Sequence, residues 1–130
     1  MNSMPRTMQN GSFEYRKVGV QTGVENASPH KLIQMLLEGA IEKVQLARGY
    51  MERGETAKKG ETVSWAMAIV DGLRSSLDIG RGGEVAENLD ALYDYMLRRL
   101  AEANLANDLG MLDEVAKLLN EIRDGWNGIG

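Results

Sequence analysis

The stretch from Gly82 to Leu100, GGEVAENLDALYDYMLRRL, decides which fold this chain is expected to adopt. A glycine pair interrupts the chain, and apolar residues then recur every three or four positions, which is the spacing of one face of an α-helix. That face consists of Val85, Leu89, Leu92, Met96 and Leu100. Because Tyr93, Tyr95 and Leu97 lie off this stripe and are too apolar to face only water, we expect the helix to pack against more than one surface.

Three more segments show the helical spacing of apolar residues, and turns rich in glycine or polar residues separate them. In residues 29–53 the spacing alternates between four and three, a seven-residue repeat typical of left-handed bundles. Four helices with short connections and no strand pattern predict an all-α fold, an antiparallel four-helix bundle. The predicted helices cover about residues 29–53, 56–78, 84–107 and 110–126, with turns at Gly54, Gly80–Gly83 and Asn107–Asp108. Their remaining core positions are Ile33, Leu37, Ala40, Val44, Ala47, Met51, Val63, Ala66, Val70, Leu73, Leu77, Leu112, Val115, Leu119, Ile122 and Trp126.

The N-terminal part differs in composition from the predicted bundle. Residues 1–28 are dominated by Met, Gly, Ser, Asn, Gln and Thr, so we expect this segment to be mobile or loosely docked. Ser28 is placed to accept hydrogen bonds from the first free N–H groups of the following helix, and Pro29 suits its first position. The chain is therefore expected to divide into a capping segment, residues 1–28, and a bundle, residues 29–127.

Composition argues against several classes of protein. The 130 residues suit a single domain, and the lack of cysteine excludes a disulfide framework and thiolate chemistry. No run of about 18 apolar residues is present, so no membrane insertion is expected. The N-terminus has no hydrophobic signal core, and we therefore expect a cytoplasmic protein. A net charge of −4 without a basic stripe argues against binding to nucleic acid.

Candidates for catalysis and metal binding are few. His30 is the only histidine, and it lacks the carboxylate neighbours at helical spacing that a metal site would need. Four carboxylates descend one side of the helix at 84–107, which allows a divalent-cation site but is more typical of a solvated face with Asp94 paired to Arg98. These carboxylates are Glu84, Glu87, Asp90 and Asp94. We therefore expect no enzymatic activity, no metal and no cofactor.

Apolar residues outside the core stripes are the strongest functional signal. Four helices of this length cannot hide all of them, so we expect part of the set to form a groove for a partner helix. The candidates are Leu32, Met35, Leu36, Gly39, Leu46, Tyr50, Trp65, Ile69, Tyr93 and Leu97, with Met96 assignable to core or groove. A wide core, burial under Phe13 and Tyr15 of the N-terminal segment, or self-association into a homo-oligomer would account for the same residues.

Several segments, in order and at matching spacing, resemble the FliS family of flagellin export chaperones. They are ASPHKLIQML at residues 27–36, Glu38-Gly39-Ala40-Ile41, Lys59-Gly60-Glu61, the stretch from Gly82 to Asn107, and Leu118 to Trp126. The resemblance covers about residues 13 to 127. Leu36 departs from the family, in which an aromatic residue is frequent at this position.

The resemblance implies a four-helix bundle with an N-terminal cap, and a role without any cofactor. Such a chaperone binds the C-terminal region of flagellin, prevents its premature polymerisation in the cytoplasm and delivers it to the flagellar type III export gate. Tyr15 matches the family's N-terminal tyrosine, which is tied to capping and to docking at the gate. We expect a monomer or a weak homodimer. The alternative is a self-associating structural or regulatory bundle that binds another export-linked protein.

Overall fold

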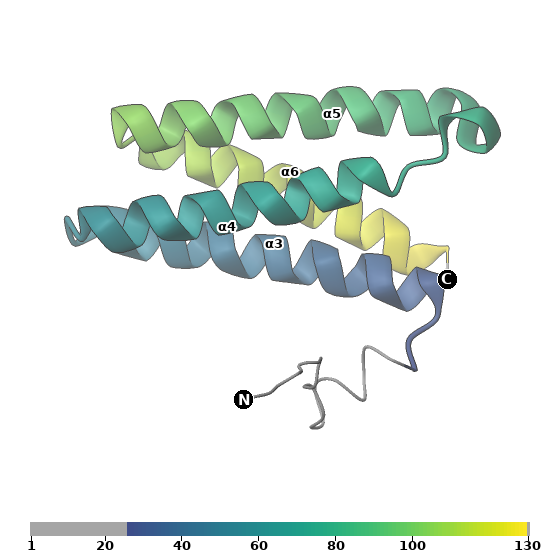
Figure 1. Cartoon of the computed structure of the whole chain (residues 1–130), viewed down its shortest axis with the longest axis horizontal. Helices are drawn as coiled ribbons and strands as arrows, with labels where there is room; N and C mark the ends of the chain where they lie inside the picture. The colour runs from purple at the N-terminus through teal and green to yellow at the C-terminus, as the bar shows by residue number, and fades with distance from the viewer. Residues whose placement is uncertain (1–25, 130) are drawn as a thin grey trace, which may run out of the picture. The chain divides into compact units, whose positions relative to one another are not determined.

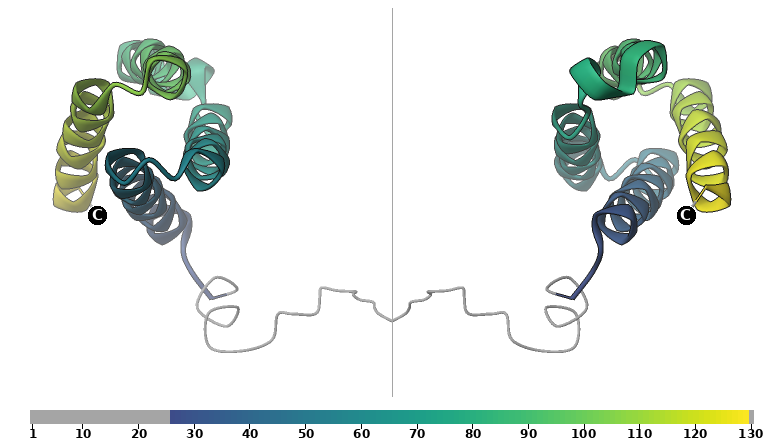
Figure 2. Two further views of the ribbon diagram at one scale, coloured as in Figure 1. Left: turned by 90° about the vertical axis from the view of Figure 1, so that its left-hand side faces the viewer. Right: turned by 90° about the vertical axis from the view of Figure 1, so that its right-hand side faces the viewer.

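The computed structural model describes residues 26–129, and these residues contain four helices and no strand. The helices are α3 (Pro29–Glu52), α4 (Thr56–Ser75), α5 (Ile79–Ala106) and α6 (Leu109–Gly128) (Figure 1). Residues 33–130 form one compact unit, in which successive helices run in opposite directions around a common core (Figure 2). The prediction of an all-α four-helix bundle is therefore confirmed.

A second unit comprises residues 1–32, of which the structure describes residues 26–32. Here Ser28 starts α3 as the sequence predicts. Its Oγ accepts a hydrogen bond of 3.1 Å from the backbone N–H of Lys31, and its carbonyl accepts one of 2.9 Å from Leu32. These bonds satisfy N–H groups that have no partner within the helix.

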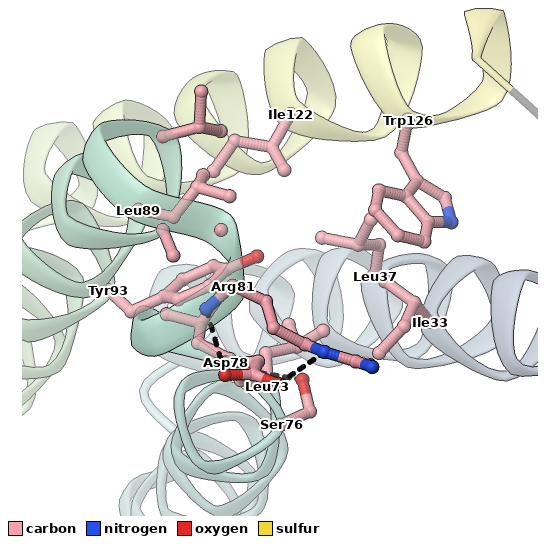
Figure 3. Close-up of a pocket in the computed structure, with 14 residues that line it drawn as sticks. Ile33, Leu37, Leu73, Ser76, Asp78, Arg81, Leu89, Tyr93, Ile122 and Trp126 are labelled. Carbon is pink, nitrogen blue, oxygen red and sulfur yellow. Dashed lines mark hydrogen bonds and ion pairs between the residues drawn. The ribbon is translucent and has the colours of Figure 1, made fainter.

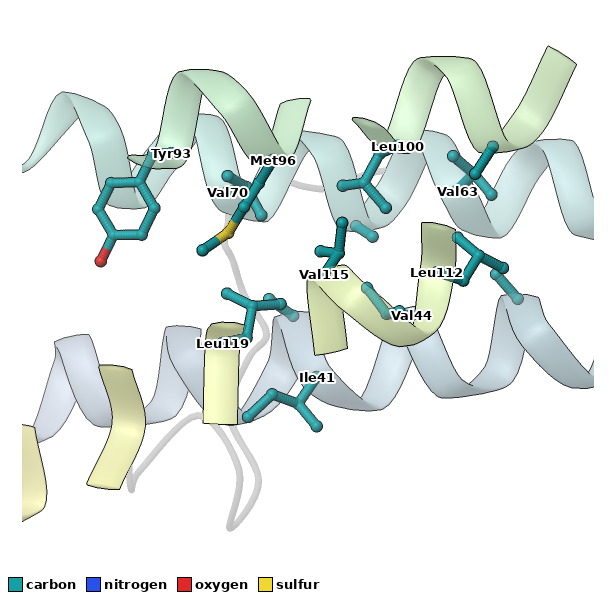
Figure 4. Packing of buried hydrophobic residues seen from close by; sticks show 14 of the residues in the cluster. Ile41, Val44, Val63, Val70, Tyr93, Met96, Leu100, Leu112, Val115 and Leu119 are labelled. Carbon is teal, nitrogen blue, oxygen red and sulfur yellow. The ribbon is translucent and has the colours of Figure 1, made fainter. Parts of the chain in front are cut away.

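The core of the unit at residues 33–130 is filled by aliphatic side chains from all four helices (Figure 4). The largest fully buried residues are Leu37, Val44, Val63, Val70, Leu73, Met96, Leu100, Leu112, Val115 and Leu119. On α3, α4 and α6 these positions belong to the stripes that the spacing predicts. Tight burial of residues of this kind is the main stabilising contribution in a domain of this size.

The stripe predicted for α5 is wrong at its N-terminal end. Val85 is 68% exposed, whereas Tyr93, which the spacing leaves off the stripe, is only 3% exposed. The buried residues of α5 are Ala86, Tyr93, Met96, Leu100 and Ala103. The small Ala86 takes the position that faces the core, because the larger Val85 is rotated from it by about 100° around the helix axis.

The turn between α4 and α5 also lies earlier than predicted. Helix α4 ends at Ser75 and α5 begins at Ile79, because the side chain of Asp78 accepts a hydrogen bond of 3.2 Å from Arg81 N–H and caps a helical turn. The glycines at 80–83 therefore belong to α5 and not to the connection. Gly83 interrupts this helix with φ 55° and ψ −133°, a conformation that is essentially restricted to glycine.

Candidate protein-binding surface

The structure brings part of the predicted groove together where α3 lies beside α4. Gly39 faces Ile69 so closely that a Cβ atom at Gly39 would lie 3.7 Å from Ile69 Cδ1. Further along the same pair of helices, Lys43 Nζ lies 3.9 Å from the centre of the Trp65 ring. We call the surface formed by Gly39, Lys43, Leu46, Trp65 and Ile69 the α3–α4 face. Its three residues on α3, Gly39, Lys43 and Leu46, share one side of the helix because they are spaced four and three residues apart.

Exposure distinguishes the α3–α4 face from the core. Trp65 is 55% exposed and Leu46 is 41% exposed, although both are large and apolar. The ammonium group of Lys43 lies over one part of the Trp65 ring, and the rest of the ring remains accessible. This cation–π contact lowers the free-energy cost of exposing the ring to water. Single exposed apolar residues are common, but exposed apolar side chains gathered on one face are typical of a binding surface.

Tyr50 extends the α3–α4 face towards the end of α3. Its side chain is half-buried, and two cations lie against its ring, Arg53 at 5.3 Å and Lys58 at 5.8 Å from the ring centre. Aromatic rings flanked by cations therefore occur twice along these two helices. Both arrangements keep an apolar ring at the surface and surround it with groups that tolerate water.

The other predicted contact residues lie elsewhere. Tyr93 and Met96 are buried in the core. Met35 is half-buried, and Leu36 and Leu97 are half-buried and packed against the core. Leu32 is exposed and belongs to the unit at residues 1–32, and Tyr15 lies outside the residues that the structure describes.

An apolar pocket of about 390 Å³ lies at one end of the bundle, and the sequence did not predict it (Figure 3). The beginnings of α3 and α5 and the ends of α4 and α6 meet there. Its apolar walls are formed by Ile33, Leu37, Leu73, Leu77, Val85, Ala86, Leu89, Tyr93, Ile122 and Trp126. Its polar lining residues, Ser76, Asp78 and Arg81, all lie in or next to the connection between α4 and α5. We call this cavity the end pocket.

The end pocket escaped prediction because the spacing assigned its wall residues to the core. The pocket could have been predicted from the ends of the core stripes, because Ile33, Leu77 and Trp126 are the terminal residues of their stripes. In an antiparallel bundle these helix ends meet at one place, and side chains at the end of a bundle have neighbours from the helices on one side only. The structure shows these three residues only partly buried, as that reasoning would require.

Tyr93 forms part of the wall of the end pocket, and its phenol is affected by burial. Burial raises the pKa of its phenol to about 12, because ionisation would place a charge in apolar surroundings.

The carboxylates on one side of α5 form ion pairs with arginines. Arg74 Nε lies 2.7 Å from Asp90 Oδ1, and this hydrogen bond lowers the pKa of Asp90. The predicted pair of Asp94 and Arg98 is confirmed at 3.2 Å.

The candidate binding surfaces of the described bundle are apolar in character. Within residues 26–129 no group of His, Cys, Asp and Glu side chains could hold a metal ion. None of the described helices is long and apolar enough to span a membrane. The two candidate binding features are the α3–α4 face and the end pocket.

Comparison with known proteins identifies relatives along nearly the whole chain. The family model "Flagellar protein FliS" matches residues 9–130. The flagellar secretion chaperone FliSB of Pseudomonas aeruginosa is 49% identical over 116 residues, which are 89% of this chain and 92% of that protein. The flagellar secretion chaperone FliS of Salmonella typhimurium is 47% identical over 120 residues, 92% of this chain and 89% of that protein. FliS of Bacillus subtilis is 37% identical over 106 residues, 82% of this chain and 78% of that protein.

Proposed function

Because this chain belongs to the FliS family of flagellar secretion chaperones, we propose that it binds the C-terminal region of flagellin and delivers this client to the flagellar type III secretion apparatus. Binding in the cytoplasm would prevent the client from polymerising too early. Secretion chaperone is the role named for each of the three relatives described above, and chaperones are not a class of enzyme.

The exposed Trp65 is the observation that best supports this proposal in the structure. A disordered client segment that folds on binding loses conformational entropy, and burial of apolar surface has to offset that cost. Covering the exposed half of one tryptophan contributes roughly 2–3 kcal/mol at about 25 cal/mol per Å². Leu46 and Ile69 beside it extend the apolar area along the helices.

The shape of the α3–α4 face favours a helical client segment. Gly39 and Tyr50 mark its ends on α3, eleven residues apart, which is about 16 Å of helix. An amphipathic helix of about three turns covers that length, and it binds through residues spaced three or four apart. We propose that one such helix of the client lies along this face while another apolar part of the client enters the end pocket.

Retention of flagellin on the immobilised full chain tests the proposal. The chain should retain full-length flagellin from a lysate of the same bacterium, and should not retain flagellin that lacks its C-terminal region. The comparison separates recognition of this region from general binding to unfolded protein. Equal retention of the truncated flagellin would contradict the proposed function.

We propose further that the N-terminal segment competes with the client and that Tyr15 takes part in docking at the export gate. Deletion of residues 1–20 should then leave the affinity for flagellin equal or higher, and a large loss would contradict competition. The chain without client should be a monomer or a weak homodimer in light scattering over a series of concentrations. A stable higher oligomer would instead favour the alternative of a self-associating bundle.

A further inference from the structure

We propose that the first turn of α5, Ile79–Gly82, is a lid hinged at Gly83 that closes over an apolar side chain of the client in the end pocket. The inference rests on the proposed function, since it needs a client. It adds a moving part to the binding site, and it assigns a role to Ile79, which does not line the pocket in the structure described here.

The position of the turn supports this role. Arg81 and Gly82 line one side of the end pocket (Figure 3). The remaining lining comes from the connection at residues 76–78, from α3, α4 and α6, and from α5 beyond Gly83. Residues 79–82 contribute no side chain to the core cluster or to the residues packed against it. The turn can therefore be displaced with little loss of core packing.

Gly83 has the conformation of a hinge. Its φ of 55° and ψ of −133° lie outside the helical region, so the turn before it is not a rigid continuation of the helix after it. Glycine adopts both this conformation and the helical one at little cost, whereas alanine strongly favours the helical one. A rotation at Gly83, with a compensating change in the connection at residues 76–78, would move the turn relative to the rest of α5.

The hydrogen bonds of the turn allow it to move as a unit. Gly82 N–H donates to the carbonyl of Asp78 at 2.7 Å, and Arg81 N–H lies 3.2 Å from both the carbonyl oxygen and the Oδ1 of Asp78. Asp78 immediately precedes the turn, so these bonds move with it. They keep the turn helical but do not anchor it to α3 or α6.

Two exposed apolar side chains provide a driving force for closure. Ile79 is 42% exposed within the turn, and Val85 is 68% exposed just after the hinge, although large apolar residues prefer burial. An apolar client side chain in the pocket would give both of them a surface to cover. Closure would then remove apolar area from water on the lid, on the pocket and on the client together.

Substitutions in the full chain test the lid with a synthetic peptide of the flagellin C-terminal region, titrated by calorimetry. We expect Ile79→Ser to weaken binding at least fivefold, because the lid loses the side chain that covers the client. Leu105→Ser is the matched control. It changes an apolar residue that is 88% exposed near the other end of the same helix, and it should leave the affinity within twofold of the wild type.

A second pair of variants tests the hinge. Gly83→Ala should also weaken binding at least fivefold, because alanine disfavours the observed conformation and shifts the turn. In Gly80→Ala, the control within the turn, the new Cβ lies 3.6 Å from Asp78 Oδ1, an ordinary contact, and affinity should be retained. Circular dichroism should show wild-type helicity for all four variants.

Hydrogen exchange provides a direct readout of closure. Saturating peptide should slow exchange of the backbone amides of residues 79–83 in the wild type and should slow it less in Gly83→Ala. Wild-type affinity in both Ile79→Ser and Gly83→Ala, or exchange at 79–83 unaffected by peptide, would overturn the lid while leaving the proposed function intact. Absence of any binding to the wild type would overturn both.

Discussion

Tyr93 shows at the level of a single residue how the core and the end pocket are connected. Its side chain is 3% exposed and packs in the cluster shared by the four helices, yet it also lines the end pocket. Burial favours the neutral phenol, which raises its pKa to about 12. Tyr93 is therefore part of the pocket wall. The pKa of its phenol is raised only as long as the ring stays buried in that wall.

We expect Tyr93→Phe to change how the stability of the protein depends on alkaline pH. The phenol ionises near pH 10 in the unfolded chain and near pH 12 in the folded protein. Its contribution to stability is thus complete below about pH 10 and is lost as the pH rises towards 12. Wild type should therefore lose stability more steeply than Tyr93→Phe above about pH 10, as measured by urea unfolding at a series of pH values.

The difference between the two proteins isolates this group, because their other titrating residues are shared. Stability curves that remain parallel from neutral pH to about pH 11 would contradict the burial of the Tyr93 phenol. Tyr93→Ala serves as a second variant, because removing the ring from the core should cost about 3–5 kcal/mol at neutral pH.

At the level of elements, Lys59 joins the beginning of α4 to the end of α5. Its side chain is only 5% exposed, and its Nζ donates a hydrogen bond of 2.8 Å to the backbone carbonyl of Asn104. Asn104 lies in the last turn of α5, where carbonyl groups lack partners within the helix and the helix dipole favours a positive charge. The buried ammonium group of Lys59 is therefore stabilised by its hydrogen bond to a backbone carbonyl at the C-terminal end of α5.

Lys59→Met should lower the free energy of unfolding by about 1.5–3 kcal/mol, because it removes a charged donor and leaves the carbonyl of Asn104 without it. Methionine keeps most of the apolar stem, so lost packing contributes little. Lys58→Met is the matched control, since the neighbouring side chain is 63% exposed and the change should be within about 0.5 kcal/mol. Equal losses in the two variants, measured by urea unfolding, would show that Lys59 is not an interhelical link.

The elements also show how far a sequence predicts this fold. The stripes of α3, α4 and α6 were predictable because large apolar residues such as Leu37, Val70 and Leu119 recur at helical spacing and are fully buried. The stripe of α5 was predictable at Met96 and Leu100, which are fully buried, but not at its N-terminal end, where two neighbouring stripes fit the sequence. Spacing favours the larger Val85, whereas close packing between helices selects Ala86.

At the level of the whole molecule, the two candidate surfaces differ in how predictable they were. Trp65 and Leu46 could be predicted, because each lies outside the core stripe of its own helix. The end pocket depends on residues as distant in sequence as Ile33 and Trp126. Periodicity within one helix has no information about a cavity that forms only where four helix ends meet.

Trp65→Ser should weaken binding of the flagellin C-terminal peptide at least tenfold, because exposed tryptophans that become buried often dominate binding energy. The melting temperature should change little, since the side chain is 55% exposed in the free protein. Ala68→Ser, at an exposed position one turn along α4, is the control and should bind as the wild type does. An affinity of Trp65→Ser within twofold of the wild type would remove the α3–α4 face from the binding site.

Calorimetric titration of the full chain with the flagellin C-terminal peptide at several temperatures tests the central claim most directly. The account predicts a one-to-one complex with a dissociation constant in the micromolar range or below. It also predicts a negative heat-capacity change, because apolar surface of the bundle and of the client is buried together. No binding at micromolar concentrations, or binding without a negative heat-capacity change, would contradict it.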